Sequence, residues 1–561
     1  MIKKLHLPLL MALVIAFVSC GRPELKPEYF TTTPQVLEAV GGKVPVTING
    51  TFPEKFLKKN GIIKVTPVLK WNGGEAKGDV FTYQGEKVEG NDQTISYKLG
   101  GNITMKTSFN YVPEMAKSEL WLEFDATFGK KNVEIPAIKI ADGVISTSEL
   151  VNLTIGSANP ADSQDAFQRI IKQAKEANIM FLIQQANLRA SELKSEGLKE
   201  FNQTVSDVYA DQKGKKINNI EISAYASPDG GVKLNTGLAE KRESNTADYM
   251  KKALKKSKVD ATVDTKYTAQ DWEGFQELVA KSNIQDKELI LRVLSMYQDP
   301  EQRENEIKNI SSVYKTLADE ILPQLRRSRL TLNYDLIGKS DEEIMALVAS
   351  DPKQLNVEEL LYAGTLTNDK ALRERIYNAT VEKFPNDYRA YNNLAEIAFR
   401  NGNIDKAESY AKKAASLNAS APEVNTNLGL IALAKGDKAA AEAYLGKASG
   451  VKETNEALGN LYVAQGQYER AVNAFGDTKS NSAALAQILA KDYNKAKNTL
   501  SSIANPDAYT DYLTAVLGAR TNNSTMVTNS LASAVKKDAS LAKRAANDLE
   551  FAKYDISAIV K

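Results

Sequence analysis

The chain has 561 residues but only one histidine and one cysteine, and this scarcity removes several classes of active site. The histidine is His6 and the cysteine is Cys20, so both lie at the extreme N-terminus. The rest of the chain offers no histidine for a catalytic triad, no thiol nucleophile and none of the usual zinc ligands. Carboxylate chemistry stays open, although no pair of carboxylates lies within a motif. We therefore expect no enzyme activity, no cofactor and no metal.

An excess of one charge is also missing. Lys and Arg number 72 against 70 Asp and Glu, so no global field favours a nucleic-acid partner. The densest basic run, 251–258, falls at the expected C-terminal end of a helix, where cations suit the helix dipole. With 43% hydrophobic and 25% charged residues, the composition is that of an ordinary globular protein. The length suggests about three or four domains.

Long hydrophobic runs are scarce, and the run from Leu7 to Val18 is too short to span a membrane comfortably. Two lysines precede this run and a small residue with Cys20 follows it, which is the order of a secretory signal peptide. Cys20 stands where a lipobox places its acylated cysteine, so the sequence resembles a bacterial lipoprotein with a signal peptide over 1–19. We expect lipid chains on Cys20 to anchor the protein to the membrane. An ordinary signal peptide with an incidental cysteine is the alternative.

Residues 20–35 are polar and contain three prolines, a composition typical of a tether between a membrane and a folded domain. They lack the acidic run that marks surface export in some lipoproteins of the Bacteroidota. We therefore expect the lipid-anchored protein to face the periplasm.

From 36 to 150, apolar and polar residues alternate, as they do in strands with one buried face. Such runs lie at 44–48, 63–69, 103–109 and 120–124, and glycine-rich turns separate them. About seven strands of this kind predict an N-terminal β-sandwich. Trp71 and Trp121 fit core or rim packing, and a sugar-stacking platform is the alternative.

Between 158 and 336, helix and strand patterns follow one another and predict a central α+β layer. Phe167, Ile170 and Ile171 share one face of a helix in this interpretation. Another helix is expected from about Ala190 to Tyr209. Strands are expected at 179–183, 217–225, 259–267 and 329–334.

The segment from Ile217 to Lys252 combines a strand, a turn and the start of a helix. Alternating apolar residues at 220, 222 and 224 predict the strand, and Ser-Pro-Asp-Gly-Gly at 227–231 forces the turn. Asn235 or Thr236 can cap the helix that follows. A strand, a glycine-rich loop and a helix start form a concave place where backbone N–H groups can meet an anion.

This segment resembles the core of the OmpA-like peptidoglycan-binding domain. Residues 224–227 occupy the family's first motif, and Gly230, Asn235, Leu238, Ala239 and Arg242 fall at the spacings of the later positions. The family's loop aspartate and helix arginine grip the diaminopimelate of the stem peptide. The resemblance therefore implies a peptidoglycan site made of Ser227, Asp229, Asn235 and Arg242. A free amino-acid end carries a carboxylate and an ammonium, which suits a guanidinium and an acid close together.

The chain departs from this family at the loop acid, because Ser227 stands where the family has aspartate. Asp229 lies two residues later and replaces the missing acid only if its side chain converges with Arg242 on an open pocket. Without the family in view, Arg242 fits a solvated helix arginine. A degenerate domain that serves only as a structural module is the alternative to wall binding.

The segment from Asp271 to Pro323 is helical and longer than the family norm. It resembles the insert of OmpA-like domains of the Bacteroidota type, including Asp271-Trp272-Glu273 and the Arg326-Arg327 pair. We expect a lid or a flank on the sheet, and occlusion of the ligand loop stays open as an alternative.

The chain from 352 to 561 repeats itself. Seven positions recur 34 residues later, from Leu394, Ala395, Ala398, Gly402, Ala407, Ala411 and Ala414 to Leu428, Gly429, Ala432, Gly436, Ala441, Leu445 and Ala448. A third copy follows at 458–475, and the spacing is that of the tetratricopeptide repeat (TPR). About five or six helix pairs predict an α-solenoid whose groove binds a protein or peptide. Repeats that only space or cap the rest are the alternative.

Taken together, these features predict a multidomain, non-enzymatic outer-membrane lipoprotein. It would bind peptidoglycan through the OmpA-like domain and recruit envelope proteins through the TPR groove. The alternative is a structural scaffold in a secretion, fimbrial or uptake assembly. An enzyme that acts on envelope glycans with two carboxylates is a third hypothesis, and it has no motif to support it.

Overall fold

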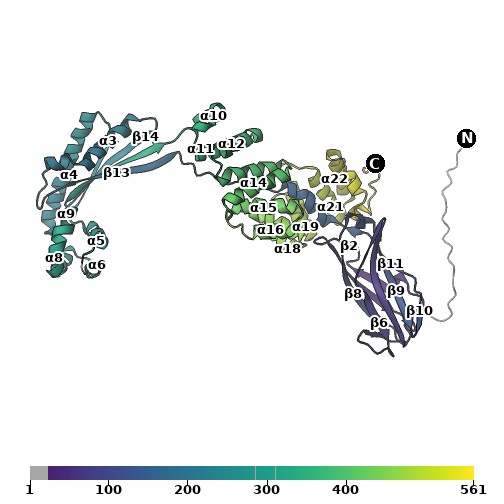
Figure 1. Cartoon of the computed structure of the whole chain (residues 1–561). Coiled ribbons are helices and arrows are strands. Elements are labelled where there is room, and N and C mark those ends of the chain that lie inside the picture. The colour runs from purple at the N-terminus through teal and green to yellow at the C-terminus, as the bar shows by residue number, and fades with distance from the viewer. Residues whose placement is uncertain (1–22, 285, 310) are drawn as a thin grey trace. The chain divides into compact units, whose positions relative to one another are not determined.

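The computed structural model describes residues 23–284, 286–309 and 311–561, which fold into two compact units (Figure 1). The first unit comprises the described residues up to Asp165 together with Thr367–Lys561, and the second comprises Ala166–Leu366. The expected signal peptide at 1–19 and Cys20 lie outside the described residues. Within the described part of the chain, no helix is long and apolar enough to cross a bilayer.

The first unit begins with two sheets that enclose one core, both antiparallel except for one parallel pair of strands, Phe81–Gly85 with Gln93–Ile95. One sheet has the order β1 (Phe30–Thr33), β3 (Lys43–Phe52), β8 (Gly101–Asn110). The other has the order β10 (Lys131–Val133), β9 (Glu119–Phe128), β4 (Gly61–Trp71), β6 (Phe81–Gly85), β7 (Gln93–Ile95), with β5 (Gly74–Lys77) on β4 and β11 (Ile138–Asp142) on β9. Val46 and Ile48 of β3 share a hydrophobic cluster with Leu120 and Leu122 of β9, as two sheets packed face to face require.

The expected tether over 20–35 is wrong for most of its described part. Phe30–Thr33 pairs with Thr47–Gly50 as strand β1, and Leu25 is only 7% exposed in the same core. The prolines that suggested a linker stand at either end of this short edge strand, a position that proline tolerates.

A short parallel pair leads from the sheets to the helical part of the first unit. Strand β12 (Val144–Ile145) pairs with β2 (Leu37–Glu38). Three short helical turns follow: η3 (Thr147–Leu150), α1 (Val151–Thr154) and η4 (Ile155–Ser157). Leu150, Val151 and Ile155 are buried in the cluster that forms the core of the C-terminal helices. The segment that follows the sheets is therefore packed into the core of the helices, while the sheets keep a hydrophobic cluster of their own.

The rest of the first unit is a helical solenoid. Its helices are α12 (Lys370–Lys383), α13 (Tyr388–Arg400), α14 (Ile404–Leu417), α15 (Pro422–Ala434), α16 (Lys438–Leu445), α17 (Lys452–Ala464), α18 (Tyr468–Phe475), α19 (Asn481–Leu489), α20 (Tyr493–Ser501), α21 (Ala508–Arg520), α22 (Ser524–Lys537) and α23 (Leu541–Ala545). From α13 to α22 they pack as antiparallel pairs. A Cβ on Gly459 of α17 would lie 2.7 Å from the ring of Phe475 in α18, so this small residue permits the close approach of its pair.

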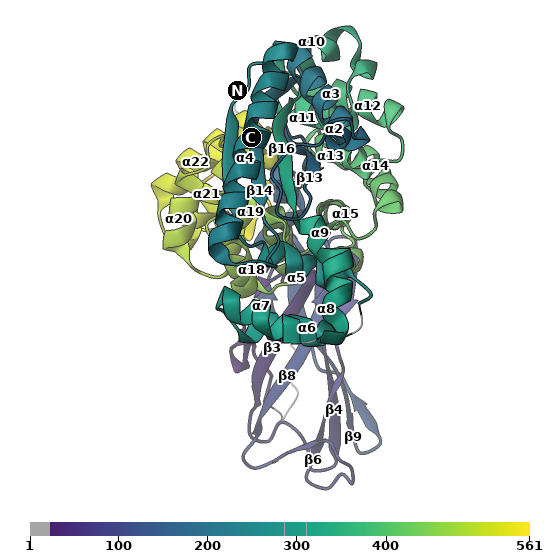
Figure 2. The same cartoon turned by 90° about the vertical axis from the view of Figure 1, so that its left-hand side faces the viewer.

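The second unit is built on a four-stranded mixed sheet. Its order is β13 (Ile170–Met180), β16 (Arg327–Ile337), β14 (Lys215–Tyr225), β15 (Val263–Thr268), in which only β14 and β15 run parallel. Helices α3 (Glu196–Ala210) and α4 (Val232–Ser257) lie along this sheet (Figure 2). Phe201 of α3 and Met250 of α4 share one cluster with Ile220 and Ile222 of β14, so both helices cover the same face.

The expected insert forms a helical subdomain at one end of this sheet (Figure 2). It contains α5 (Trp272–Lys281), α6 (Lys287–Met296), α7 (Pro300–Asn309), α8 (Ser311–Thr316), a π-helical turn (Leu317–Ile321) and α9 (Leu322–Leu325). Phe275, Ile290 and Leu322 belong to a separate hydrophobic cluster, so the insert has a core of its own. After β16, α10 (Asp341–Ser350) and α11 (Val357–Thr365) complete the unit.

Two local predictions in this unit are wrong. Ile170 and Ile171 lie in strand β13 and not on a helix, because every residue from Ile170 to Met180 pairs with β16 and both side chains stay exposed. Helix α4 begins at Val232 after Gly231, so Asn235 and Thr236 lie inside the helix and do not cap it. The spacing that suggested a helical face was a local signal, and strand pairing with distant residues overrode it. Asn235 instead donates its side-chain amide to the carbonyls of Ser227 and Gly230 in the preceding loop.

Candidate functional site

Arg242, the arginine of the predicted peptidoglycan site, lies inside the second unit. Its side chain is among the largest that are fully buried, with 1% exposed. Nε donates to the carbonyl of Gln185 at 3.0 Å, Nη1 to that of Tyr225 at 2.8 Å and Nη2 to that of Leu182 at 3.3 Å. The guanidinium carbon is 5.0 Å from the centroid of the Phe181 ring. Burial lowers the pKa of Arg242 to about 10. The guanidinium thus ties three backbone segments together.

Asp229, the acid proposed to replace the family's aspartate, pairs with a different arginine. Its Oδ2 is 3.0 Å from Nη2 of Arg326, at the end of the insert, and both side chains are nearly buried. Ser227 donates its hydroxyl to Asp229, and Nε of Arg326 donates to that hydroxyl oxygen at 3.2 Å. Asn235 donates to the carbonyls of Ser227 at 3.0 Å and Gly230 at 2.8 Å. The loop is therefore closed on itself by hydrogen bonds.

The insert also covers the loop sterically. A cavity of about 20 Å³ lies between Pro228 and Asp229 on one side and Trp272, Phe275 and other insert residues on the other. Such a volume holds about one water molecule and no amino-acid end of a peptide. Of the alternatives left open for the insert, occlusion of the loop agrees with this geometry.

The four predicted residues therefore lie near one another without forming an open grip. Ser227, Asp229 and Asn235 stabilise the loop, and Arg242 holds backbone carbonyls behind it. Among the described residues, no cluster of histidine, cysteine, aspartate or glutamate could hold a metal ion. Peptidoglycan binding by these four residues stays a prediction, and three of the five N–H groups of the Arg242 guanidinium already donate to backbone carbonyls.

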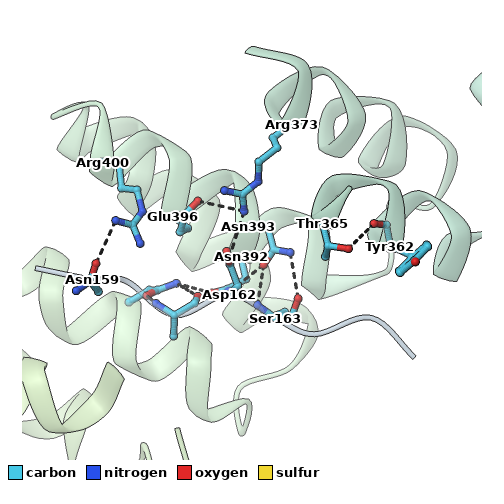
Figure 3. A network of polar contacts seen from close by, with 12 residues as sticks. Asn159, Asp162, Ser163, Tyr362, Thr365, Arg373, Asn392, Asn393, Glu396 and Arg400 are labelled. Carbon is cyan, nitrogen blue, oxygen red and sulfur yellow. Dashed lines mark hydrogen bonds and ion pairs between the residues drawn. The ribbon is translucent and has the colours of Figure 1, made fainter. Parts of the chain in front are cut away.

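A second candidate site lies on the solenoid. Side chains of its helices bind an extended stretch of the same chain, residues 159–163 (Figure 3). Asn427 of α15 accepts from the N–H of Ala161 at 2.7 Å and donates to its carbonyl at 2.8 Å. Asn393 of α13 does the same for Ser163, at 2.7 and 3.1 Å. Asn392 donates to the carbonyl of Ala161 at 2.9 Å. Residues 161 and 163 are thus held through their main chain, as a paired strand would be.

Charged side chains hold the same stretch through its side chains. Nη2 of Arg373 in α12 lies 3.3 Å from a carboxylate oxygen of Asp162. The hydroxyl of Ser163 donates to Glu423 of α15 at 2.9 Å, and the amide of Asn159 donates to Glu456 of α17 at 3.0 Å. Helices α13, α15 and α17 are the first helices of successive pairs, so this surface is the inner groove of the solenoid.

Two arginines of the groove share one buried glutamate. Arg400 of α13 donates to Glu396 and also lies 3.3 Å from Oδ1 of Asn159, while Nη2 of Arg373 lies 3.9 Å from the other oxygen of Glu396. Both arginines are thereby held over the bound stretch. Burial raises the pKa of the Glu456 carboxyl, and the hydrogen bonds from Asn159 oppose this shift.

The groove residues were missed from the sequence, although one signal was present. Asn393 and Asn427 are 34 positions apart, the same spacing as the repeat itself. They are polar residues on the buried side of helices whose neighbours are apolar or small, so a functional or structural partner was implied. The expected start of the central domain at 158 is wrong, because residues 158–165 belong to the first unit.

The comparisons with known proteins concern this solenoid. Residues 374–422 and 400–449 match the family model of the tetratricopeptide repeat. The C-terminal helical region therefore contains TPR repeats over residues 374–449. The repeat predicted from the 34-residue spacing is therefore confirmed. No curated protein matches the chain.

Solved structures resemble the chain only weakly. A tetratricopeptide repeat protein from Parabacteroides merdae is 15% identical, with 35% of this chain and 85% of that chain covered and a TM-score of 0.28. PilW, a type IV pilus biogenesis factor, is 17% identical, with coverages of 33% and 94% and a TM-score of 0.26. The Cut9-Hcn1 hetero-tetramer of the APC/C is 14% identical, with coverages of 58% and 76% and a TM-score of 0.29. At these TM-scores the likeness carries no argument about function.

Proposed function

We infer that this protein is a non-enzymatic scaffold of the bacterial envelope, lipid-anchored through Cys20, that holds protein partners through its TPR solenoid. TPR repeats are protein-interaction modules, which supports the scaffold function directly. The membrane anchor rests on the sequence alone, from the charged start, the apolar run and Cys20. The outer membrane and a periplasm-facing position rest on the resemblance and on the absence of an acidic run after Cys20.

Within this scaffold, the second unit is a degenerate OmpA-like domain that serves as a structural module. The observation that carries this choice is the burial of Arg242, whose three donating nitrogens all bond to backbone carbonyls. A zwitterionic wall fragment needs a guanidinium that can reach its carboxylate, and it needs an acid for its ammonium. Here Asp229 already has Arg326 as its cation, and the insert leaves a cavity of only about 20 Å³.

The absence of wall binding is testable by co-sedimentation. We expect the purified full chain to pellet with purified peptidoglycan no more than it pellets alone, because the loop offers no open site. A wall-binding OmpA-like domain in a parallel sample is the positive control, because its pelleting shows that the peptidoglycan preparation can be bound. Saturable pelleting of this chain, reversed by free diaminopimelate, would contradict the structural-module assignment and restore the tether hypothesis.

The lipid anchor is testable by fractionation of cells that produce the full chain. We expect the wild-type protein to stay with the membranes after a high-salt wash. Cys20→Ala should move most of it to the soluble fraction, because an unlipidated chain keeps no acyl chain to partition into the bilayer. Ser19→Ala is the matched control, since it leaves Cys20 in place. An unchanged membrane fraction for Cys20→Ala would exclude the anchor.

A further inference from the structure

The most informative feature outside the predicted site is the stretch from Asn159 to Asp165 in the solenoid groove. We propose that the inner groove is a binding site for an extended peptide with an acid opposite Arg373 and that residues 159–165 are its resident ligand. A partner protein would then bind there by displacing this stretch with an extended segment of its own. The inference rests on the proposed scaffold function only in that the partner is a protein.

The groove binds this stretch through its main chain, as it would bind a separate peptide. Asn427 and Asn393 each bond to both the N–H and the carbonyl of one residue, at Ala161 and Ser163 respectively. Alternate residues of an extended chain present these groups on the same side. Main-chain recognition of this kind accepts any sequence that can extend and fit, so it does not require the chain's own segment.

The resident stretch is held differently from the residues just before it. Leu150, Val151 and Ile155 are buried in the hydrophobic core of the solenoid, so separating them from it would expose apolar surface. From Asn159 onward the residues lie outside that hydrophobic cluster and are held mainly by hydrogen bonds and ion pairs. Asn159 and Asp162 are exposed, whereas Pro160, Ala161 and Ser163 are buried against the groove. Water can replace such contacts at modest net cost. The stretch after Ala158 is therefore the part that can leave while its anchor stays.

The side-chain contacts define the partner's chemistry. Arg373 meets the carboxylate of Asp162, so the groove favours an acid at that one position, while Glu423 and Glu456 contact its uncharged neighbours. Glu423 accepts from the hydroxyl of Ser163, which favours serine or threonine directly after the acid. Ala161 is fully buried, which restricts that position to a small residue. The preferred segment is thus extended, with a small residue, an acid and a hydroxyl residue in succession.

Attachment at both ends makes the resident stretch a strong competitor. A tethered ligand is present at a high effective concentration, and a free peptide must overcome it to bind. The intact chain should therefore bind such a peptide only weakly, because the resident stretch occupies the groove most of the time. A chain without the resident stretch should bind the peptide more tightly, and the gain in affinity measures how often the groove of the intact chain is free. This difference separates a gated groove from a groove that binds no peptide.

The first test uses a fluorescein-labelled peptide with the sequence of residues 157–167 and fluorescence anisotropy. We expect the full chain with residues 159–165 replaced by seven Gly and Ser residues to bind it about tenfold or more tightly than the wild type. Adding Asn427→Ala to that variant should weaken binding about tenfold. Lysine in place of the peptide's aspartate at position 162 should weaken binding by about the same factor. Equal binding by wild type and opened chain would exclude the gate. No binding by the opened chain would exclude the site.

A second test keeps the resident stretch in place and does not depend on the folding of the replaced chain. The chain has one cysteine, so Ser163→Cys in a Cys20→Ala background gives a single thiol in the groove. We expect slow labelling of this thiol and a saturable, severalfold acceleration when the unlabelled 157–167 peptide is added. The peptide with lysine in place of aspartate at position 162 should accelerate labelling less than the unchanged peptide does. A labelling rate that the peptide leaves unchanged would overturn the proposal, whatever the cellular partners of the scaffold are.

Discussion

Arg520→Met is expected to lower the free energy of unfolding of the first unit by about 3–5 kcal/mol, the usual cost of breaking a buried ion pair. Nε of Arg520 lies 2.9 and 2.8 Å from the two carboxylate oxygens of Glu550, and Nη1 lies 3.0 Å from Glu38. Burial raises the pKa of the Glu550 carboxyl, and Arg520 opposes this shift. Without the guanidinium, two carboxylates face each other at the junction of strand β2 with the solenoid.

Hydrogen exchange measured across a denaturant series checks this expectation, because peptides from each unit report separately on its opening. Lys435→Met is the matched control in the same solenoid, since Lys435 pairs with Asp405 and Glu408 at a solvent-exposed surface. It should cost less than about 1 kcal/mol. A loss for Arg520→Met no larger than that of the control would show that the carboxylates find other partners.

Arg242→Ala is expected to destabilise the second unit by about 3 kcal/mol or more. The substitution removes the Arg242 donor from the carbonyls of Gln185 and Tyr225, and each abandoned buried acceptor costs about 1–3 kcal/mol. The carbonyl of Leu182 also loses Arg242 but keeps the N–H of Gln185 at 3.1 Å. Water that enters the vacated space would reduce this loss. The same hydrogen-exchange series, read on peptides of the second unit, gives the measurement.

Lys241→Ala is the control for this substitution, because Lys241 is exposed on the same helix next to Arg242. It should change stability by no more than about 0.5 kcal/mol. If Arg242→Ala were as mild as Lys241→Ala, the arginine would not be structural, and the wall-binding assignment would regain its basis. A large loss of stability with unchanged behaviour toward peptidoglycan agrees with the degenerate domain.

The two expected losses are independent of each other. Arg520 and Arg242 lie in different units, and no partner is shared between them. We therefore expect each substitution to leave the protection of the other unit unchanged. Loss of protection in both units from one substitution would show that the units unfold cooperatively.

Much of the fold could be predicted where the relevant signal is local and periodic. The alternation at 44–48 became the inward-facing side of β3, and the 34-residue spacing became the helix pairs of the solenoid. Local signals failed where distant pairing decided the outcome. Ile170 and Ile171 lie in a strand because β16, more than 150 residues later, supplies the hydrogen bonds. Phe30–Thr33 is a strand and not a tether for the same reason.

The candidate sites show the same division. By itself, the sequence determined the repeat, the sheet-rich N-terminal region and the residues around the loop at 227–231. Only the tertiary structure decided what these residues contact. Arg242 donates to carbonyls about 60 positions away, Asp229 pairs with Arg326, and residues 159–165 occupy a groove made by helices more than 200 positions later. The reason is physical: residue type fixes which bonds a side chain can make, but the packing of distant segments fixes which partners it meets.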